Sequence, residues 1–235
     1  MNYKAFRSAR KKDATDYLTI LSKLSITHSK IDFKESLLEN QWGYKIEGIK
    51  VPVDLNSLRH IRPLGFSNLE IIIDLEIISN IDDWDKLNDP FVSLNFRSHM
   101  KGTNSLTGKT HYLSFHVDRH NGAKTVEIHP LYHLQYIQNA NAKPKDEFDH
   151  GESLQMDIPR MMHFPMELIL GVSFVISNFS PKIYDKLIQD RQYVNLCKIY
   201  QERVWRPYIN SLENFWLQNP KHWLWDPKLN CPYLV

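Results

Sequence analysis

Glycine and cysteine are scarce in this chain, and each shortage excludes a class of site. Only 8 of the 235 residues are glycine, and they stand apart, so neither a G-x-G-x-x-G nor a G-x-x-x-x-G-K phosphate-binding loop is present. The two cysteines, Cys197 and Cys231, are too few for a disulfide framework or for a zinc site built from cysteine alone. We therefore expect a reducing compartment.

Long hydrophobic runs and an excess of one charge are also missing. The longest apolar stretch, from about Phe164 to Phe179, is broken by Glu167 and is shorter than the ~20 residues that span a bilayer. The N-terminus lacks the apolar segment of a secretory signal. Basic residues number 29 and acidic residues 27, whereas a wholly basic nucleic-acid domain would be more one-sided. These features predict a cytoplasmic protein with no membrane partner.

The composition that remains is that of an ordinary globular protein. The hydrophobic fraction is 42%, which excludes a disordered chain, and 235 residues can bury one core without disulfide support. The sequence therefore predicts a single α+β domain over residues 1–235. Its parts are a helical segment at 1–41, a sheet at 42–136, a second helical segment at 160–219 and an irregular tail at 220–235.

The middle of the chain alternates as strands do. Residues 42–53 are also extended in character, with Gly48 as a candidate turn. Asn121-Gly122 is typical of a short hairpin turn between the last two strands. We therefore expect an antiparallel meander of about four strands, packed on the C-terminal helices. The four segments are Leu69–Ile78, Val92–His99, His111–Asp118 and Lys124–His129.

Helical patterns flank this region. Asp13 is a candidate cap for a first helix, and Asp32 with Glu35 has capping-box spacing, which predicts a second short helix that ends near Asn40. The segment from Met166 to Phe179 is apolar on all sides, which is typical of a buried helix. We expect this helix to cover the face of the sheet that carries Leu113, Phe115, Val126 and Ile128.

The other face of the sheet collects polar residues. Side chains alternate between the two faces of a strand, so His116 and Asp118 face away from the core if Phe115 faces it. The same count places Glu127 and His129 on this outer face. The preceding strands add Asp74, Glu76, Arg97 and His99, and His111, His120 and His133 lie nearby in the sequence.

Three interpretations of this polar cluster stay open. It is a solvated surface if opposite charges pair across strands, at about 0.2–1 kcal/mol each. It is a metal or acid–base site if His116, Asp118, Glu127 and His129 act catalytically, with His116 and His129 binding a divalent metal that activates water. It is a nucleic-acid or protein surface if Arg97 contacts phosphate.

The two ends of the chain carry further candidates. The first twelve residues hold no acid, so they form either an idle tail or a nucleic-acid contact through Arg7, Arg10, Lys11 and Lys12. The last residues are rich in aromatics, which either pack on their own domain or anchor a partner protein. The partner-binding candidates are Trp223, Trp225 and Tyr233.

One part of the chain resembles proteins of a known genomic setting. The resemblance lies in the run from His129 to Tyr136, then Ile158-Pro159-Arg160, then Phe164 to Gly171 and Ser177-Asn178-Phe179. These segments resemble uncharacterised bacterial proteins of mobile or defence-type operons, over residues 110 to 180. The resemblance implies a bacterial protein that works with neighbouring gene products, and it carries over no catalytic residue.

The sequence leaves three hypotheses for the function, of which two have positive support. The lack of a standard catalytic signature, the aromatic C-terminus and the resemblance favour a non-enzymatic subunit of a bacterial multi-protein assembly, of anti-phage defence type. Such a subunit needs no cofactor and contacts other proteins of the same operon and nucleic acid. The alternative is a metal-dependent phosphodiesterase or nuclease that uses the sheet cluster. A small-ligand binding protein is the remaining rival.

Overall fold

The protein is built on one long antiparallel sheet. The structure is a computed structural model that describes residues 2–34, 38–57, 61, 64–84, 86, 89–120, 130–137 and 161–218. Seven strands lie side by side in chain order, and each pairs antiparallel with the next. They are β1 (Asp32–Phe33), β2 (Gln41–Pro52), β3 (Glu70–Asn80), β4 (Phe91–Thr103), β5 (Thr110–Arg119), β6 (Tyr132–Ile137) and β7 (Met161–Met162).

The predicted α+β class with an antiparallel sheet is confirmed, but the prediction of about four strands is wrong. The chain at 42–53 does not turn at Gly48. Instead it continues as β2 with a bulge, where the register shifts between Ile46 and Ile49 and Gly48 adopts a φ of +67°. The predicted strand Lys124–His129 lies outside the described residues. The neighbour of β5 in the sheet is β6, which begins only after Pro130.

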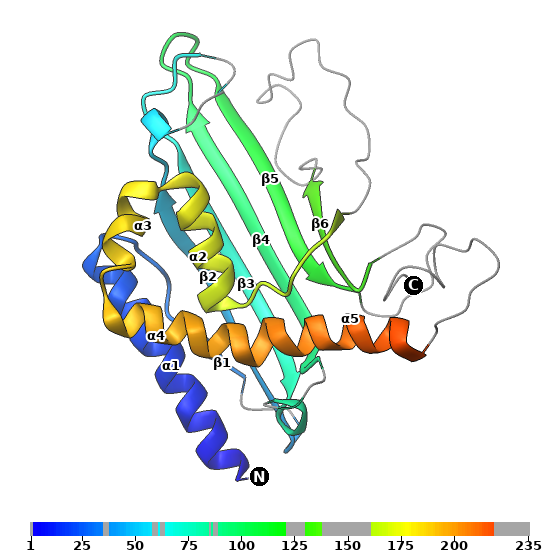
Figure 1. Ribbon diagram of the computed structural model, residues 1–235. Helices are drawn as coiled ribbons and strands as arrows, with labels where there is room; N and C mark the ends of the chain where they lie inside the picture. Colours follow the sequence, from blue (N-terminus) through cyan, green and yellow to red (C-terminus); the bar gives the residue numbers. More distant parts are fainter. Residues whose placement is uncertain are drawn as a thin grey trace, which may run out of the picture.

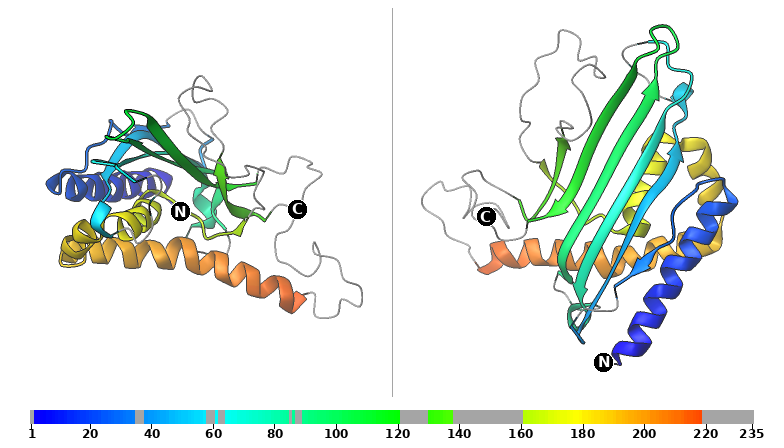
Figure 2. Two further views of the ribbon diagram at one scale, coloured as in Figure 1. Left: turned by 90° about the horizontal axis from the view of Figure 1, so that it is seen from above. Right: turned by 180° about the vertical axis from the view of Figure 1, so that it is seen from behind.

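The helices form the second layer. Most of them follow the sheet in the chain, and all the described helices lie on one face of it (Figures 1 and 2). They are α1 (Tyr3–Lys23), α2 (Leu168–Phe179), α3 (Pro181–Leu187), α4 (Arg191–Tyr200) and α5 (Arg206–Gln218), with short 3₁₀ turns at Leu55–Ser57 and Ile81–Asp83 and a π-helical turn at Gln201–Trp205 between α4 and α5. No helix in this part of the chain has the length and apolarity needed to cross a membrane.

Helix α2 lies at the centre of the core, as its apolar sequence predicts. Seven of its residues are buried, and it lies over the middle strands (Figure 1). A Cβ at Gly171 would lie 2.6 Å from the Phe96 ring, so glycine allows α2 to approach β4 closely. Phe115 is buried as expected, whereas Leu113 is 48% exposed. Val126 and Ile128 lie outside the described residues.

The N-terminal segment differs from its prediction in two ways. Helix α1 begins at Tyr3, where the Asn2 side chain accepts a hydrogen bond from the Ala5 N–H at 3.0 Å. Asp13 is therefore inside the helix and is not its cap. The predicted second helix is also wrong at its start, because Asp32 and Phe33 pair with β2 as strand β1. This pairing satisfies backbone groups that a capping box would have used locally.

Candidate metal centre on the outer face of the sheet

Two neighbouring strands, β5 and β6, bring two histidines and one carboxylate together on the face opposite the helices. His116 and Asp118 are two residues apart on β5, so their side chains leave the sheet on the same side. In the β5–β6 pairing Asp118 stands directly opposite His133, and His116 stands opposite Gln135. On the other side of β5, His116 is paired with Arg97 of β4. The register alone therefore places these side chains in one cluster.

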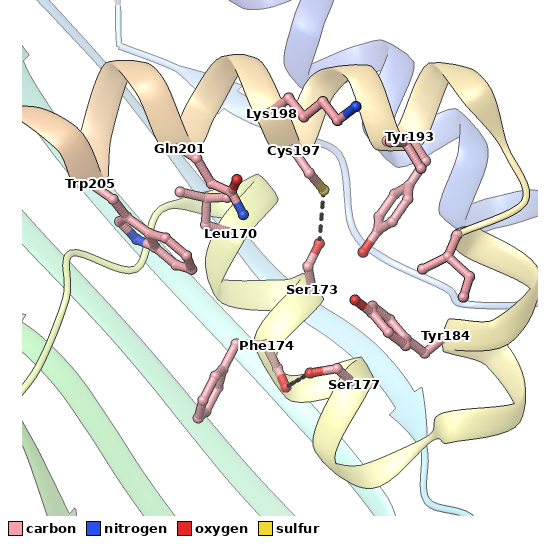
Figure 3. Close-up of a pocket in the computed structure, with 12 residues that line it drawn as sticks. Leu170, Ser173, Phe174, Ser177, Tyr184, Tyr193, Cys197, Lys198, Gln201 and Trp205 are labelled. Carbon is pink, nitrogen blue, oxygen red and sulfur yellow. Dashed lines mark hydrogen bonds between the residues drawn. The ribbon is translucent and has the colours of Figure 1, made fainter.

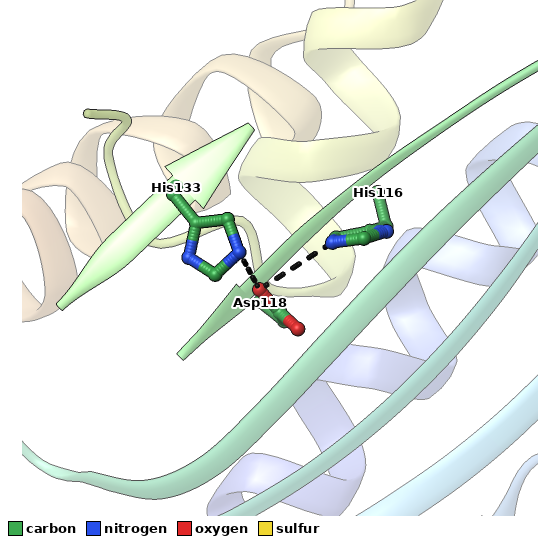
Figure 4. A group of neighbouring side chains, drawn as sticks. All are labelled: His116, Asp118 and His133. Atoms are coloured by element: carbon green, nitrogen blue, oxygen red, sulfur yellow. Dashed lines mark ion pairs between the residues drawn. The ribbon is translucent and has the colours of Figure 1, made fainter. Parts of the chain in front are cut away.

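The geometry of this cluster is close. Oδ1 of Asp118 lies 2.9 Å from Nε2 of His133 and 3.7 Å from Nε2 of His116 (Figure 4). The two imidazole centroids are 5.7 Å apart, with their planes at 76°. One potential ligand atom from each residue can be chosen so that all three lie within 4.8 Å of one another. His133 is buried, whereas His116 and Asp118 are half-buried, so the cluster is open on one side.

Two imidazoles and a carboxylate are a donor set that suits a divalent transition metal. Ligand atoms about 2.0–2.1 Å from a tetrahedral zinc ion are about 3.3 Å apart. The two distances to Asp118 bracket that separation, and the ligand atoms of the two histidines lie within 4.8 Å of each other. Three protein ligands leave coordination positions for water or substrate, as in catalytic sites.

The neighbouring polar side chains of the same face have local partners. Asp74 accepts a hydrogen bond from the Gly48 N–H at 2.8 Å, and His99 Nδ1 lies 2.9 Å from Ser114 Oγ. Lys34 forms an ion pair with Glu76. These contacts favour a solvated, paired surface over β3 and β4. The first interpretation of the polar face therefore fits this part of the sheet, and the second fits the cluster around Asp118 on β5 and β6.

Arg97 is the cation nearest to the cluster in the strand register. It is exposed, and its Nε donates a hydrogen bond to Asn95 Oδ1 at 3.1 Å. This bond holds the guanidinium along β4 and leaves its terminal amino groups for other acceptors. Because Arg97 is paired with His116, an anion bound at the cluster would lie on the same face as this guanidinium.

The structure brings only part of the predicted site together. His116 and Asp118 lie side by side on one face, with His116 Nε2 3.7 Å from Asp118 Oδ1, whereas Glu127 and His129 lie outside the described residues. The sequence places His133 near the predicted site but not in it, because the fourth predicted strand ends at His129. The signal was present: Tyr132, Leu134 and Tyr136 alternate with His133 and Gln135, as in a strand.

The basic residues of the N-terminus lie on α1 and contact the rest of the chain. Arg7 donates hydrogen bonds to the main-chain carbonyl groups of residues 38, 39 and 41, and Arg10 is buried beside Asp13 at 2.9 Å. The Lys11 ammonium lies 5.1 Å from the centroid of the Phe33 ring. The ammonium of Lys12 is mostly exposed and pairs with an acid one turn later.

The aromatic residues proposed as a partner anchor, Trp223, Trp225 and Tyr233, lie outside the described residues. Among known proteins, no family model matches the chain, and no curated protein or solved structure is significantly similar to it. The chemistry of the site is therefore argued from its geometry.

Proposed function

We propose that this protein is a divalent-metal-dependent phosphodiesterase whose metal is held by His116, Asp118 and His133. The observation that supports this proposal is the convergence of the three ligand atoms within 4.8 Å, two of them from partly exposed residues, on the face of the sheet opposite the helices. A bound divalent ion would activate a water molecule near neutral pH and polarise a phosphoryl oxygen. Arg97, on the same face, supports a phosphodiester as the substrate class, since guanidinium groups pair with phosphate oxygens.

Each residue has a distinct task in this proposal. Asp118 lies between the two imidazoles and orients both of them toward one point. The burial of His133 fixes its ring on the sheet, while half-buried His116 faces the open side. Arg97 binds the non-bridging oxygens of the substrate and positions its phosphorus over the His116–Asp118–His133 cluster.

Metal analysis combined with a hydrolysis assay tests the proposal. The purified protein is expected to hold one zinc, manganese or iron per chain by mass spectrometry of its metals, and to hydrolyse bis(p-nitrophenyl) phosphate. His116→Ala and His133→Ala should lose both the metal and the activity. The matched control is His99→Ala, which removes an imidazole from the same face one strand away and should retain both. If the protein holds one metal ion per chain but hydrolyses no phosphodiester, the site is structural and the proposed enzymatic activity is refuted.

A second candidate function is a subunit of a multi-protein assembly, as the resemblance to defence-operon proteins implies. Exposed apolar side chains on α5 favour it: Ile209 is 48% exposed and Leu217 is 67% exposed. Large apolar side chains on one helix are typical of contact surfaces. Ile209→Glu together with Leu217→Glu should abolish co-purification of operon proteins without lowering the melting temperature. Unchanged co-purification would exclude this helix as the contact.

A further inference from the structure

A cavity of about 460 Å³ lies on the helical side of the molecule, away from the histidine cluster. It is enclosed by α2, α3, α4 and the π-helical turn Gln201–Trp205 (Figure 3). Its volume falls in the range of small-molecule sites. The helices cover one face of the sheet and the His116 cluster lies on the other, so the two sites are separate.

One end of the cavity is apolar. Leu170 and Phe174 of α2 face Trp205 across it (Figure 3). The Trp205 indole N–H donates a hydrogen bond to the Pro165 carbonyl oxygen at 3.0 Å, which fixes the ring against the wall. Trp205 ends the π-helical turn, and such turns are rare and occur frequently at functional sites. An aromatic ring would find two aromatic walls here.

The other end of the cavity carries hydroxyl groups. Ser173 Oγ lies 3.0 Å from the Tyr17 hydroxyl and 3.7 Å from Cys197 Sγ. The Tyr184 and Tyr193 hydroxyls point toward this group (Figure 3). Within the described residues, the Tyr184 hydroxyl makes no hydrogen bond, so it can donate one to a ligand.

The charges around the cavity define the ligand further. Among its described lining residues none is acidic, and only Lys198, along the edge of the cavity in Figure 3, is charged. We propose that the cavity binds a small, uncharged aromatic compound that carries one hydroxyl or carbonyl group. Its ring lies between Phe174 and Trp205, and its polar group reaches the Ser173 and Tyr184 hydroxyls. This site is independent of the proposed metal centre.

Calorimetric and fluorescence titration with 2-naphthol tests the site. One 2-naphthol per chain should bind saturably, and naphthalene, which lacks the hydroxyl, should bind more weakly. Tyr184→Phe should weaken 2-naphthol binding by about three- to tenfold, the worth of one hydrogen bond, and should leave naphthalene binding unchanged. The anion 2-naphthoate should bind more weakly than 2-naphthol, because the cavity would desolvate its carboxylate, and Lys198, the only charged residue among the described lining, lies along the edge.

Two variants locate the binding on the molecule. Val194→Phe fills the cavity from α4 and should abolish binding, whereas Ile209→Phe makes a matched aliphatic-to-phenylalanine change on α5 outside the cavity and should not. If circular dichroism shows that Val194→Phe is unfolded, Ser177→Phe fills the same space from α2.

Three results would overturn the proposal: no saturable 2-naphthol binding by the wild type, binding retained in a folded cavity-filling variant, or equal losses for 2-naphthol and naphthalene in Tyr184→Phe. His116→Ala should bind 2-naphthol like the wild type. Failure of the metal centre is thereby distinguished from failure of the cavity.

Discussion

Glu167 is a fully buried carboxyl group at the start of the central helix, and its titration should be visible in the stability of the whole protein. It is 1% exposed, and its side chain caps α2 by accepting hydrogen bonds from the N–H groups of Ile169 at 2.9 Å and Leu170 at 2.6 Å. Burial raises the pKa of Glu167 from 4.5 to about 7, although the two backbone hydrogen bonds oppose the shift. The free energy of unfolding must therefore depend on this group between these two pH values.

The sign follows from proton binding in the two states. Between the unfolded pKa of 4.5 and the folded pKa of about 7, native Glu167 holds more protons than unfolded Glu167. Raising the pH through this window therefore lowers the stability of the protein. The full shift corresponds to about 3 kcal/mol, of which roughly 2 to 3 kcal/mol is lost between pH 5 and pH 8.

Glu167→Gln isolates this contribution. Glutamine keeps an oxygen that can cap α2 but carries no titrating proton, so the variant should gain roughly 2 to 3 kcal/mol relative to the wild type as the pH rises from 5 to 8. Urea unfolding of both proteins across this range measures the difference, and all other titrating groups cancel. Asp190→Asn, at the cap of α4, is the matched carboxylate-to-amide control; because asparagine caps as well as aspartate, it should cost only about 0.3–1 kcal/mol, for the lost charge at the helix N-terminus. A constant difference between Glu167→Gln and the wild type at all pH values would refute the reasoning.

Three further substitutions test the packing. Gly171→Ala gains about 1 kcal/mol of helix propensity but forces a methyl group against the buried Phe96 ring, which costs about 1–3 kcal/mol. Urea unfolding should therefore show a net loss of stability, and a gain would contradict the close approach of α2 to β4. Arg119→Ala leaves buried Asp89 without the ion pair at 3.0 Å and should cost about 3 kcal/mol, whereas a cost below about 1 kcal/mol would show that Asp89 is solvated. Arg10→Ala should lower the melting temperature, because this guanidinium is part of the fold, and an unchanged value would assign it to the surface.

The long strands could be predicted because one face of each is buried. The alternation in β3, β4 and β5 identifies both the strands and the side that faces the helices, since exposure follows the two-residue period of the backbone. The two-residue strands β1 and β7 have no such signal. They exist because a longer neighbour offers free backbone groups, which is a property of the folded sheet and not of their own residues.

Only the part of the candidate site that lies on a single strand could be predicted from the sequence. His116 and Asp118 are two residues apart, so the pleat alone places them on one face. The third ligand depends on which segment pairs with β5 and in which register, and a shift of one residue would turn His133 to the opposite face. The Asn121-Gly122 signal favours a nearby partner strand, and the alternation at residues 132–136, although typical of a strand, does not indicate which neighbour that strand pairs with or in which register.

In the N-terminal basic segment, tertiary contacts decide which cations are exposed, so the charge pattern of the sequence alone does not predict it. Five cations without an acid are typical of a solvated tail or a nucleic-acid contact, but α1 needs Arg7 and Arg10 for other purposes. Arg7 donates hydrogen bonds to main-chain carbonyl groups just before β2 and at its first residue, and the Arg10 guanidinium lies 5.4 Å from the centroid of the Phe6 ring. Phe6 in turn packs edge-on against Trp42 of β2, which anchors the first turns of the helix. A nucleic-acid contact by this segment would therefore depend on the exposed side chains of Lys4 and Lys12. Lys12→Ala should lower the salt dependence of any such binding by about one phosphate contact without destabilising the fold.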